Sequence, residues 1–259
     1  MKRNNYILLS LLLLLLGGGA ASEQKQVVAD NKLQGALQKA GVPGSIATQV
    51  MKQVRSNRES FSRAVAEIID QDYYLWCLVD KKYALGAAYE PEDLLVLKSG
   101  TYLVNRSGLR LRKAAAAALE TMAYGAKKDG VTLVVSSCYR SYDYQQQVYE
   151  RNVKQMGQAA ADRESARPGH SQHQLGLAVD FGSIDDSFAA TAQGRWLGKN
   201  AWRYGWSLSY PQGYEAITGY RWESWHYRYV GPELSRFIRT YFDGIQQYAL
   251  AFLHHYTTE

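Results

Sequence analysis

The sequence predicts an α+β protein, and three observations support this class. Segments with helical periodicity alternate irregularly with short runs of β-branched and aromatic residues, as expected when helices and strands share one domain. The 259 residues are 46% hydrophobic and include only 5 Pro, which excludes a disordered, collagen-like or disulfide-scaffold protein. The length suits one main domain of about 180 residues with a smaller appendage.

The N-terminus has the order of residues found in a secretory signal. Lys2 and Arg3 precede an apolar run over residues 6–16, and a Gly/Ala stretch follows at 17–21. We therefore assign residues 1–21 as a signal peptide cleaved near Ala21 and expect an exported protein, in the periplasm, outside the cell or associated with the cell wall. The alternative is an uncleaved anchor. No other stretch is apolar enough to span a membrane, so no stable span is expected after cleavage.

Residues 22–71 are predicted to form a helical N-terminal segment. Apolar residues recur there at helical spacing, and Pro43 between two glycines is the one strong helix breaker. We expect two or three short helices, and this segment carries no recognisable chemistry.

Residues 72–259 form the main domain in this prediction. A strand is expected at 73–79, and the alanine-rich run at 109–128 predicts a helix that ends at Asp129 and Gly130. The remaining runs predict strands at 131–135, 177–181, 206–209 and 225–230, and helices at 142–157, 196–204 and 232–254.

Charge and cysteine content limit the classes of partner and metal site. The net charge of +6 is too small and too scattered to indicate nucleic-acid binding, although it is compatible with an anionic cell-wall polymer. Cys77 and Cys138 lie in or beside apolar runs, where one disulfide and two buried thiols are equally compatible with an exported chain. Because no CxxC motif is present, a metal site would be built from histidine and carboxylate.

Three of the five histidines lie in Gly- and aromatic-rich segments. His170 follows a Pro-Gly pair and is interpreted as a turn residue. His173 and Asp180 are seven residues apart, which is about 23 Å on a straight strand, so they can share a metal only if the chain folds back, as Gly176 permits. Asp180 ends an apolar run and therefore needs a metal, an arginine or a cap as partner.

The segment 221–230 supplies a third histidine, His226, and a spare carboxylate, Glu223. Zinc held by His173, Asp180 and His226 keeps one coordination position open, which is typical of catalytic zinc. Glu223 would then be the general base. Because residues 223 and 226 would face opposite ways on a regular strand, we expect a turn or bulge between them.

Arg140 follows the strand predicted at 131–135. An arginine there can bind the oxyanion that develops at an attacked carbonyl. Alternatively, it is a surface arginine or simply the partner of Asp180, and the residues alone leave the functional and the structural interpretation open.

Together these segments resemble the VanY-type D-Ala-D-Ala carboxypeptidases, zinc peptidases that trim bacterial cell-wall stem peptides and include L,D-carboxypeptidase relatives. The resemblance covers roughly residues 72–250. It depends on an ordered set of motifs, YRSYDYQ (139–145), SQHQLGLAVDFG (171–182), YGWSLSYPQGYEAITGY (204–220) and ESWHYRYVG (223–231).

The resemblance implies a fold, a cofactor and a set of roles. The implied fold is a small α+β domain with a central antiparallel sheet, flanking helices and Zn²⁺ on the sheet face. The implied roles are metal ligation by His173, Asp180 and His226, base catalysis by Glu223, stabilisation of the tetrahedral intermediate by Arg140, and peptide binding by Gln145 and Ser171.

Three positions depart from the family pattern. Cys138 replaces a common Gly, Ser209 stands where an Arg often precedes the Tyr-Pro pair, and Ser224 replaces a usual Pro. None is an implied ligand. Ser209 removes a cation expected near the cleft, which puts the substrate preference in question.

The sequence therefore predicts a secreted zinc carboxypeptidase that removes the terminal D-alanine from peptidoglycan stem peptides. One alternative is an L,D-carboxypeptidase or an endopeptidase on the same polymer, because the pocket rather than the metal selects the bond. The other is a non-catalytic cell-wall binding module. The complete set of ligands and base favours an enzyme, since binding requires no base.

Overall fold

The computed structural model describes residues 19–258, which divide into two compact units. Residues 78–247 form one unit, and the described residues before and after them form the other. The sequence placed the domain boundary between residues 71 and 72 and kept the C-terminal residues with the main domain. Residues 1–18 of the expected signal peptide lie outside the described part. No helix within residues 19–258 combines the length and hydropathy needed to cross a membrane.

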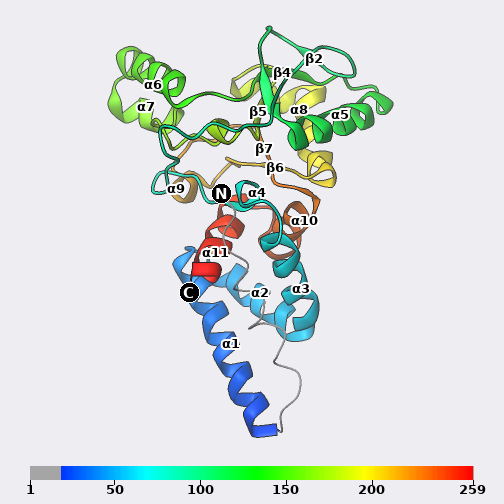
Figure 1. Cartoon of the computed structure of the whole chain (residues 1–259), viewed down its shortest axis with the longest axis vertical. Helices are drawn as coiled ribbons and strands as arrows, with labels where there is room; N and C mark the ends of the chain where they lie inside the picture. Colours follow the sequence, from blue (N-terminus) through cyan, green and yellow to red (C-terminus); the bar gives the residue numbers. More distant parts are fainter. Residues whose placement is uncertain (1–18, 259) are drawn as a thin grey trace. The chain divides into compact units, whose positions relative to one another are not determined.

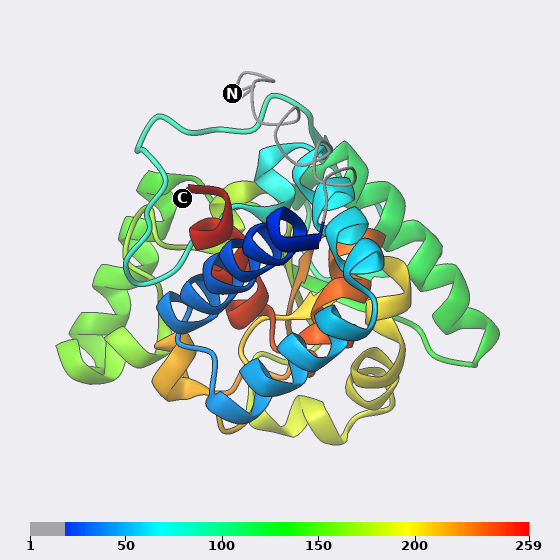
Figure 2. The same cartoon turned by 90° about the horizontal axis from the view of Figure 1, so that it is seen from below.

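The first unit is helical (Figures 1 and 2). It contains α1 (Gly19–Lys39), α2 (Gly44–Ser56), α3 (Arg58–Ile69), α4 (Tyr73–Trp76) and most of α11 (Gln246–Thr258). The apolar faces of α2 and α3 are buried, and Asn57 caps α3 by accepting a 3.0 Å bond from the Ser60 amide. α11 contacts α3 through the rings of Phe61 and Phe252, whose centroids are 6.1 Å apart. The helices expected over 22–71 are thus present.

The strand expected at 73–79 is wrong, because residues 73–76 form the helical turn α4. The rings of Tyr73 and Trp76 meet edge to face with centroids 4.7 Å apart. The i,i+3 spacing of a helical turn brings such a pair together, whereas a strand would separate it. Local aromatic packing therefore outweighs strand propensity here.

The second unit is built on a five-stranded sheet in the order β2-β4-β5-β7-β6. All neighbouring pairs are antiparallel except β2 and β4, which are parallel. Its strands are β2 (Leu103–Val104), β4 (Val134–Ser137), β5 (Ala178–Phe181), β6 (Trp206–Leu208) and β7 (His226–Tyr229), and a separate pair is formed by β1 (Leu94–Val96) and β3 (Arg110–Arg112). The predicted α+β class with a small, largely antiparallel sheet is confirmed.

Helices flank this sheet (Figures 1 and 2), with α5 on one side and α6 and α7 on the other. They are α5 (Lys113–Lys128), α6 (Tyr142–Met156), α7 (Gln158–Glu164), α8 (Ala192–Asn200), α9 (Glu215–Thr218) and α10 (Pro232–Tyr241), with 3-10 turns η1 (Gln172–Leu175), η2 (Asp186–Ala190) and η3 (Ala201–Tyr204). Three aromatic rings from β5, β6 and β7 pack together: the centroid of the Phe181 ring lies 6.4 Å from that of Trp206 and 5.9 Å from that of Tyr227. This aromatic core supports β5 and β7, which carry the candidate site.

Several predicted boundaries differ from the structure. The helix expected at 196–204 begins at 192 in α8 and is followed from 201 by the 3-10 turn η3. The helix expected at 109–128 begins only at 113, because 110–112 pair with β1. The strand expected at 131–135 spans 134–137 instead. The single helix expected at 232–254 is divided into α10 and α11, because Asp243 and Gly244 both take positive φ angles, 50° and 80°, and so interrupt the helix.

Candidate metal centre and active site

The chain folds back between His173 and Asp180, as the sequence required. Residues 172–175 form the 3-10 turn η1, which Ser171 caps by accepting a 3.3 Å bond from the His173 amide. Gly176 ends the turn with φ of +71°, a left-handed conformation that favours glycine. β5 then begins at Ala178. The turn brings the His173 side chain to the strand that carries Asp180.

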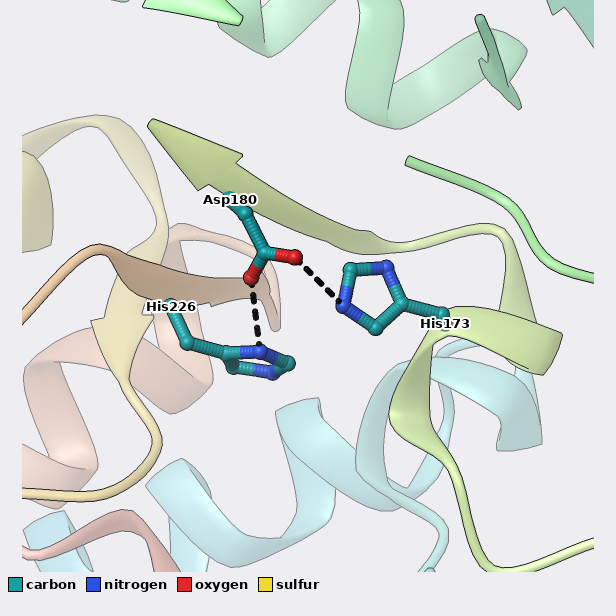
Figure 3. A group of neighbouring side chains, drawn as sticks. All are labelled: His173, Asp180 and His226. Carbon is teal, nitrogen blue, oxygen red and sulfur yellow. Dashed lines mark ion pairs between the residues drawn. The ribbon is translucent and has the colours of Figure 1, made fainter. Parts of the chain in front are cut away.

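His173, Asp180 and His226 meet at one point on the sheet (Figure 3). Asp180 on β5 lies directly opposite His226 on β7 in the antiparallel register. Its two carboxylate oxygens face different imidazoles: Oδ2 is 3.2 Å from His173 Nε2, and Oδ1 is 3.0 Å from His226 Nδ1. One ligand atom from each residue lies within 4.8 Å of the others. The sequence prediction that these three residues come together is borne out geometrically.

Charge and hydrogen bonding at this group fit a cation. His173 Nδ1 lies 2.6 Å from the Cys138 carbonyl oxygen, which only accepts, so Nδ1 carries the proton and Nε2 turns a lone pair toward Asp180. His173 Nε2 and Asp180 Oδ1 are buried, and neither has a hydrogen-bond partner among the described residues. Facing acceptors at this distance are stabilised by a shared cation, and two nitrogens with one carboxylate are the donors zinc prefers.

Burial and mutual electrostatics set the protonation of the group. Burial, followed by the charge of Arg140, lowers the pKa of His173 to about 4. Burial acts to raise the pKa of Asp180, but the neighbouring His173 and His226 outweigh it, and the pKa of this carboxyl lies well below its usual range. A neutral His173 therefore faces an ionised Asp180 at neutral pH, the protonation states that metal binding requires.

Glu223 lies beside this group, on the turn before β7. Residues 224 and 225 form the turn, and the His226 amide donates to the Glu223 carbonyl over 3.2 Å. The expected break between these residues is thus confirmed. The Glu223 carboxylate is 3.6 Å from His226 Nδ1 and is largely buried. Burial, and next the charge of Asp180, raise the pKa of Glu223 well above its usual range, which suits a group that must hold a proton.

Arg140 contacts both Asp180 and Gln145. One guanidinium nitrogen is 3.6 Å from Asp180 Oδ2, and another donates to Gln145 Oε1 over 2.9 Å. The Gln145 amide is anchored in turn by a 2.7 Å bond to the Ala166 carbonyl. Of the two interpretations of Arg140, the contact with Asp180 is therefore observed. The role of Arg140 toward an oxyanion and those of Gln145 and Ser171 toward a peptide remain predictions.

The other residues singled out in the sequence are not part of the metal group itself. His170 Nδ1 lies 2.6 Å from the Asp80 carbonyl, and its amide bonds to the Arg167 carbonyl, as expected of a turn residue. Cys77 and Cys138 are buried and are not joined in a disulfide. The effect of Ser209 on substrate preference stays a prediction. Ser209 is buried and donates to Gln172 over 2.7 Å, so its hydroxyl lies behind His226.

Two residues that contact His226 were not among the predicted site residues. Tyr210 packs its ring against the imidazole with centroids 4.8 Å apart, and Gln172 places Oε1 3.3 Å from His226 Nε2. Gln172 adjoins His173 in the sequence, but that position alone does not reveal that its side chain reaches His226. Only the return of β7 beside η1 brings the two together.

Comparison with known proteins places this site in a family. The family model for VanY, described as D-alanyl-D-alanine carboxypeptidase, matches residues 108–232. The putative carboxypeptidase YodJ of Bacillus subtilis is 39% identical over 180 residues, an alignment that covers 67% of this chain and 66% of the relative. The chain thus spans slightly less than two thirds of the length of that relative.

Two solved structures share the fold. The LdcB LD-carboxypeptidase is similar with a TM-score of 0.60 and 37% identity, over 66% of this chain and 86% of that one. A variant of the vancomycin-resistance D,D-pentapeptidase VanY, in complex with Zn(II), has a TM-score of 0.57 and 33% identity, over 68% and 98% of the two chains. The fold is that of the VanY-like carboxypeptidases, and the site is a His-Asp-His group that can hold a metal ion. The chain belongs to the VanY D-alanyl-D-alanine carboxypeptidase family.

Proposed function

We propose that this protein is an exported, zinc-dependent carboxypeptidase that removes the terminal D-alanine from peptidoglycan stem peptides. One observation carries the proposal: the buried His173, Asp180 and His226 direct ligand atoms to one point, with the Glu223 carboxylate 3.6 Å from His226 Nδ1. A binding module requires no such base. Export is part of the proposal because residues 1–21 have the order of a signal peptide, and the polymer lies outside the membrane.

The side chains suit peptide hydrolysis. A zinc ion bound by His173, Asp180 and His226 supplies Lewis acidity for the scissile carbonyl. Glu223 takes a proton from the attacking water and delivers it to the amine of the leaving alanine, a role for which its buried position beside His226 is suitable. Arg140 provides a fixed positive charge beside the metal group for the charge that develops on the carbonyl oxygen.

A D,D-carboxypeptidase acting on the pentapeptide is the first candidate, because the family model and the zinc-bound VanY have that specificity in their descriptions. A second candidate is an L,D-carboxypeptidase acting on the tetrapeptide. It is favoured by the similarity to LdcB, with its 37% identity and TM-score of 0.60. Both release D-alanine, and the metal chemistry is common to both.

Mass spectrometry of defined stem peptides separates these candidates. The zinc-loaded protein lacking residues 1–21 is incubated with pentapeptide and tetrapeptide stems. Loss of one alanine from the pentapeptide establishes D,D-activity, whereas loss only from the tetrapeptide establishes L,D-activity. If neither mass changes while the protein pellets with cell walls, the carboxypeptidase proposal fails and a binding module takes its place.

The variant Glu223→Gln tests the role of the base. We expect hydrolysis to fall by about 10²–10⁴-fold because no carboxylate remains to accept the proton, while bound zinc, measured by elemental analysis, stays at the wild-type level. Glu150→Gln is the matched control, since Glu150 lies on the exposed surface of α6 and bonds only to Gln146 in the described structure. Turnover of Glu223→Gln equal to that of the control would refute the assignment.

A further inference from the structure

A cluster of buried polar side chains lies behind His226, on the side of the imidazole away from Asp180. Gln172 precedes a metal ligand in η1, Ser209 follows β6, and Gln246 is the first residue of α11. Each is at most 3% exposed. Buried amides and hydroxyls are costly unless they are hydrogen-bonded, so the partners of these groups are informative.

The orientation of the Gln246 amide is fixed by the backbone. Its Nε2 donates to the Ser207 carbonyl over 3.2 Å and lies 3.3 Å from Ser209 Oγ. A carbonyl can only accept, so the NH₂ end of this amide must face Ser207. Gln246 Oε1 is therefore directed toward Gln172.

The orientation of Gln172 follows from that of Gln246. Gln172 Nε2 donates to Gln246 Oε1 over 3.2 Å, which leaves Gln172 Oε1 on the opposite side of the amide. There it accepts from Ser209 Oγ over 2.7 Å. The ring closes, because the Ser209 hydroxyl accepts from Gln246 and donates to Gln172. Each of the three side chains gives a hydrogen bond to one member and receives one from the other.

The remaining neighbour of Gln172 Oε1 is His226 Nε2, at 3.3 Å. Because the oxygen only accepts, Nε2 must carry the imidazole proton. Nδ1 then presents its lone pair to the metal group, 3.0 Å from Asp180 Oδ1. A flipped Gln172 would place its NH₂ against the Ser209 hydroxyl and His226, and its oxygen against the oxygen of Gln246. The backbone carbonyl of Ser207 thus fixes the orientation of Gln246, Gln246 fixes that of Gln172, and Gln172 determines the tautomer of His226.

We infer that Gln172, Ser209 and Gln246 form an oriented hydrogen-bond ring that positions His226, with Nε2 protonated and Nδ1 free for the metal; this inference rests on the metal-dependent function proposed above. The two histidines differ in the kind of group that orients the imidazole. His173 is oriented by the Cys138 backbone carbonyl, which no substitution removes. The orientation of the His226 imidazole depends instead on the side chains of Gln172 and Ser209. Gln172 and Ser209 are accordingly positioning residues, and partners of this kind affect metal affinity about 10–100-fold.

The first test measures zinc affinity by competition with a chelator. Gln172→Met keeps the length of the side chain but replaces the amide by a thioether, which is only a weak acceptor, and we expect zinc affinity to fall by about 10–100-fold. Ser209→Ala should weaken binding in the same direction but less, because Gln172 keeps its bond to Gln246. The matched control is Ser235→Ala, which removes another buried hydroxyl, one that bonds to the Trp202 carbonyl over 2.7 Å. The control should bind zinc like the wild type.

The second test reads the tautomers directly. In the zinc-loaded, ¹⁵N-histidine-labelled wild type, we expect His226 to be protonated at Nε2 and His173 at Nδ1. Zinc affinities of Gln172→Met and Ser209→Ala within twofold of the control would overturn the inference, as would a His226 protonated at Nδ1. If Gln172→Met does not fold, the zinc affinity of Ser209→Ala and the histidine spectrum of the wild type still test the inference. Failure of the wild type to bind zinc would instead refute the proposed function itself.

Discussion

Substitution of Gly176 by alanine should destabilise the turn that joins His173 to Asp180. Gly176 has φ of +71° and ends η1 between His173 and Asp180. A Cβ atom built on it would lie 2.9 Å from Leu94 Cδ2 and 3.2 Å from Arg112 Cγ. The alanine would therefore meet two independent costs, one from its backbone conformation and one from its neighbours.

The size of the effect can be worked out from these two costs. A non-glycine residue in the left-handed region costs about 1–2 kcal/mol, and overpacking at contacts this short costs about 1–3 kcal/mol. Together they predict a loss of about 3 kcal/mol in the free energy of unfolding. For a domain of this size that corresponds to a fall in Tm of about 6–12 °C.

Thermal unfolding followed by circular dichroism, in excess zinc, tests this prediction. Gly130→Ala is the matched control because Gly130 has nearly the same φ, +74°, but no atom lies within 4 Å of its built Cβ. The control should show the backbone cost alone, about 1–2 kcal/mol. If Gly176→Ala unfolds at the same temperature as Gly130→Ala, the crowding argument is wrong.

Two further predictions concern the metal and the response to acid. Removal of zinc by a chelator should lower Tm by about 5–11 °C if the ion had been present at 100 times its Kd, since that occupancy adds about 2.7 kcal/mol; an unchanged Tm would contradict a metal at this site. Bonds from Arg167, and then from Tyr149 and Gln158, hold the pKa of Asp162 below its usual range. Because the folded pKa lies below the unfolded value of about 3.9, the stabilisation is complete above about pH 4 and is lost in more acidic solution. The Tm of Asp162→Asn should accordingly lie below that of the wild type at pH 7 and approach it as the pH falls below 4, whereas a difference independent of pH would refute the assignment.

The metal group was predictable from the sequence because its residues leave few alternatives. His173 and Asp180 require the chain to fold back, and Gly176 marks where this happens. The turn between Glu223 and His226 follows from the same strand geometry, since the two side chains would otherwise point to opposite faces. In both cases the two side chains can meet only if the chain turns between them, and the structure contains that turn.

Features that depend on long-range contacts were not predictable in this way. The start of α5 at 113 depends on the pairing of 110–112 with β1, and the division of the C-terminal helix depends on the backbone of Asp243. The contact of Gln172 with His226 depends on where β7 returns beside η1. Nothing in the local pattern of Ser209 indicates that its hydroxyl bonds to Gln172. The spacing of apolar residues predicts the secondary structure of one segment, whereas these features depend on contacts between segments that are far apart in the sequence.

The register of β5 and β7 has a consequence for how the protein reaches its native state. Asp180 and His226 can share an ion because they are directly opposite each other across the two strands. A slip of one residue would turn the Asp180 carboxylate to the other face of the sheet, and the ion would lose a ligand. An ion that binds only the native pairing adds its binding energy to that pairing alone. Bound zinc would therefore stabilise the native register of β5 and β7 relative to slipped registers. Metal uptake during refolding would then report the fraction of chains whose sheet is assembled in register.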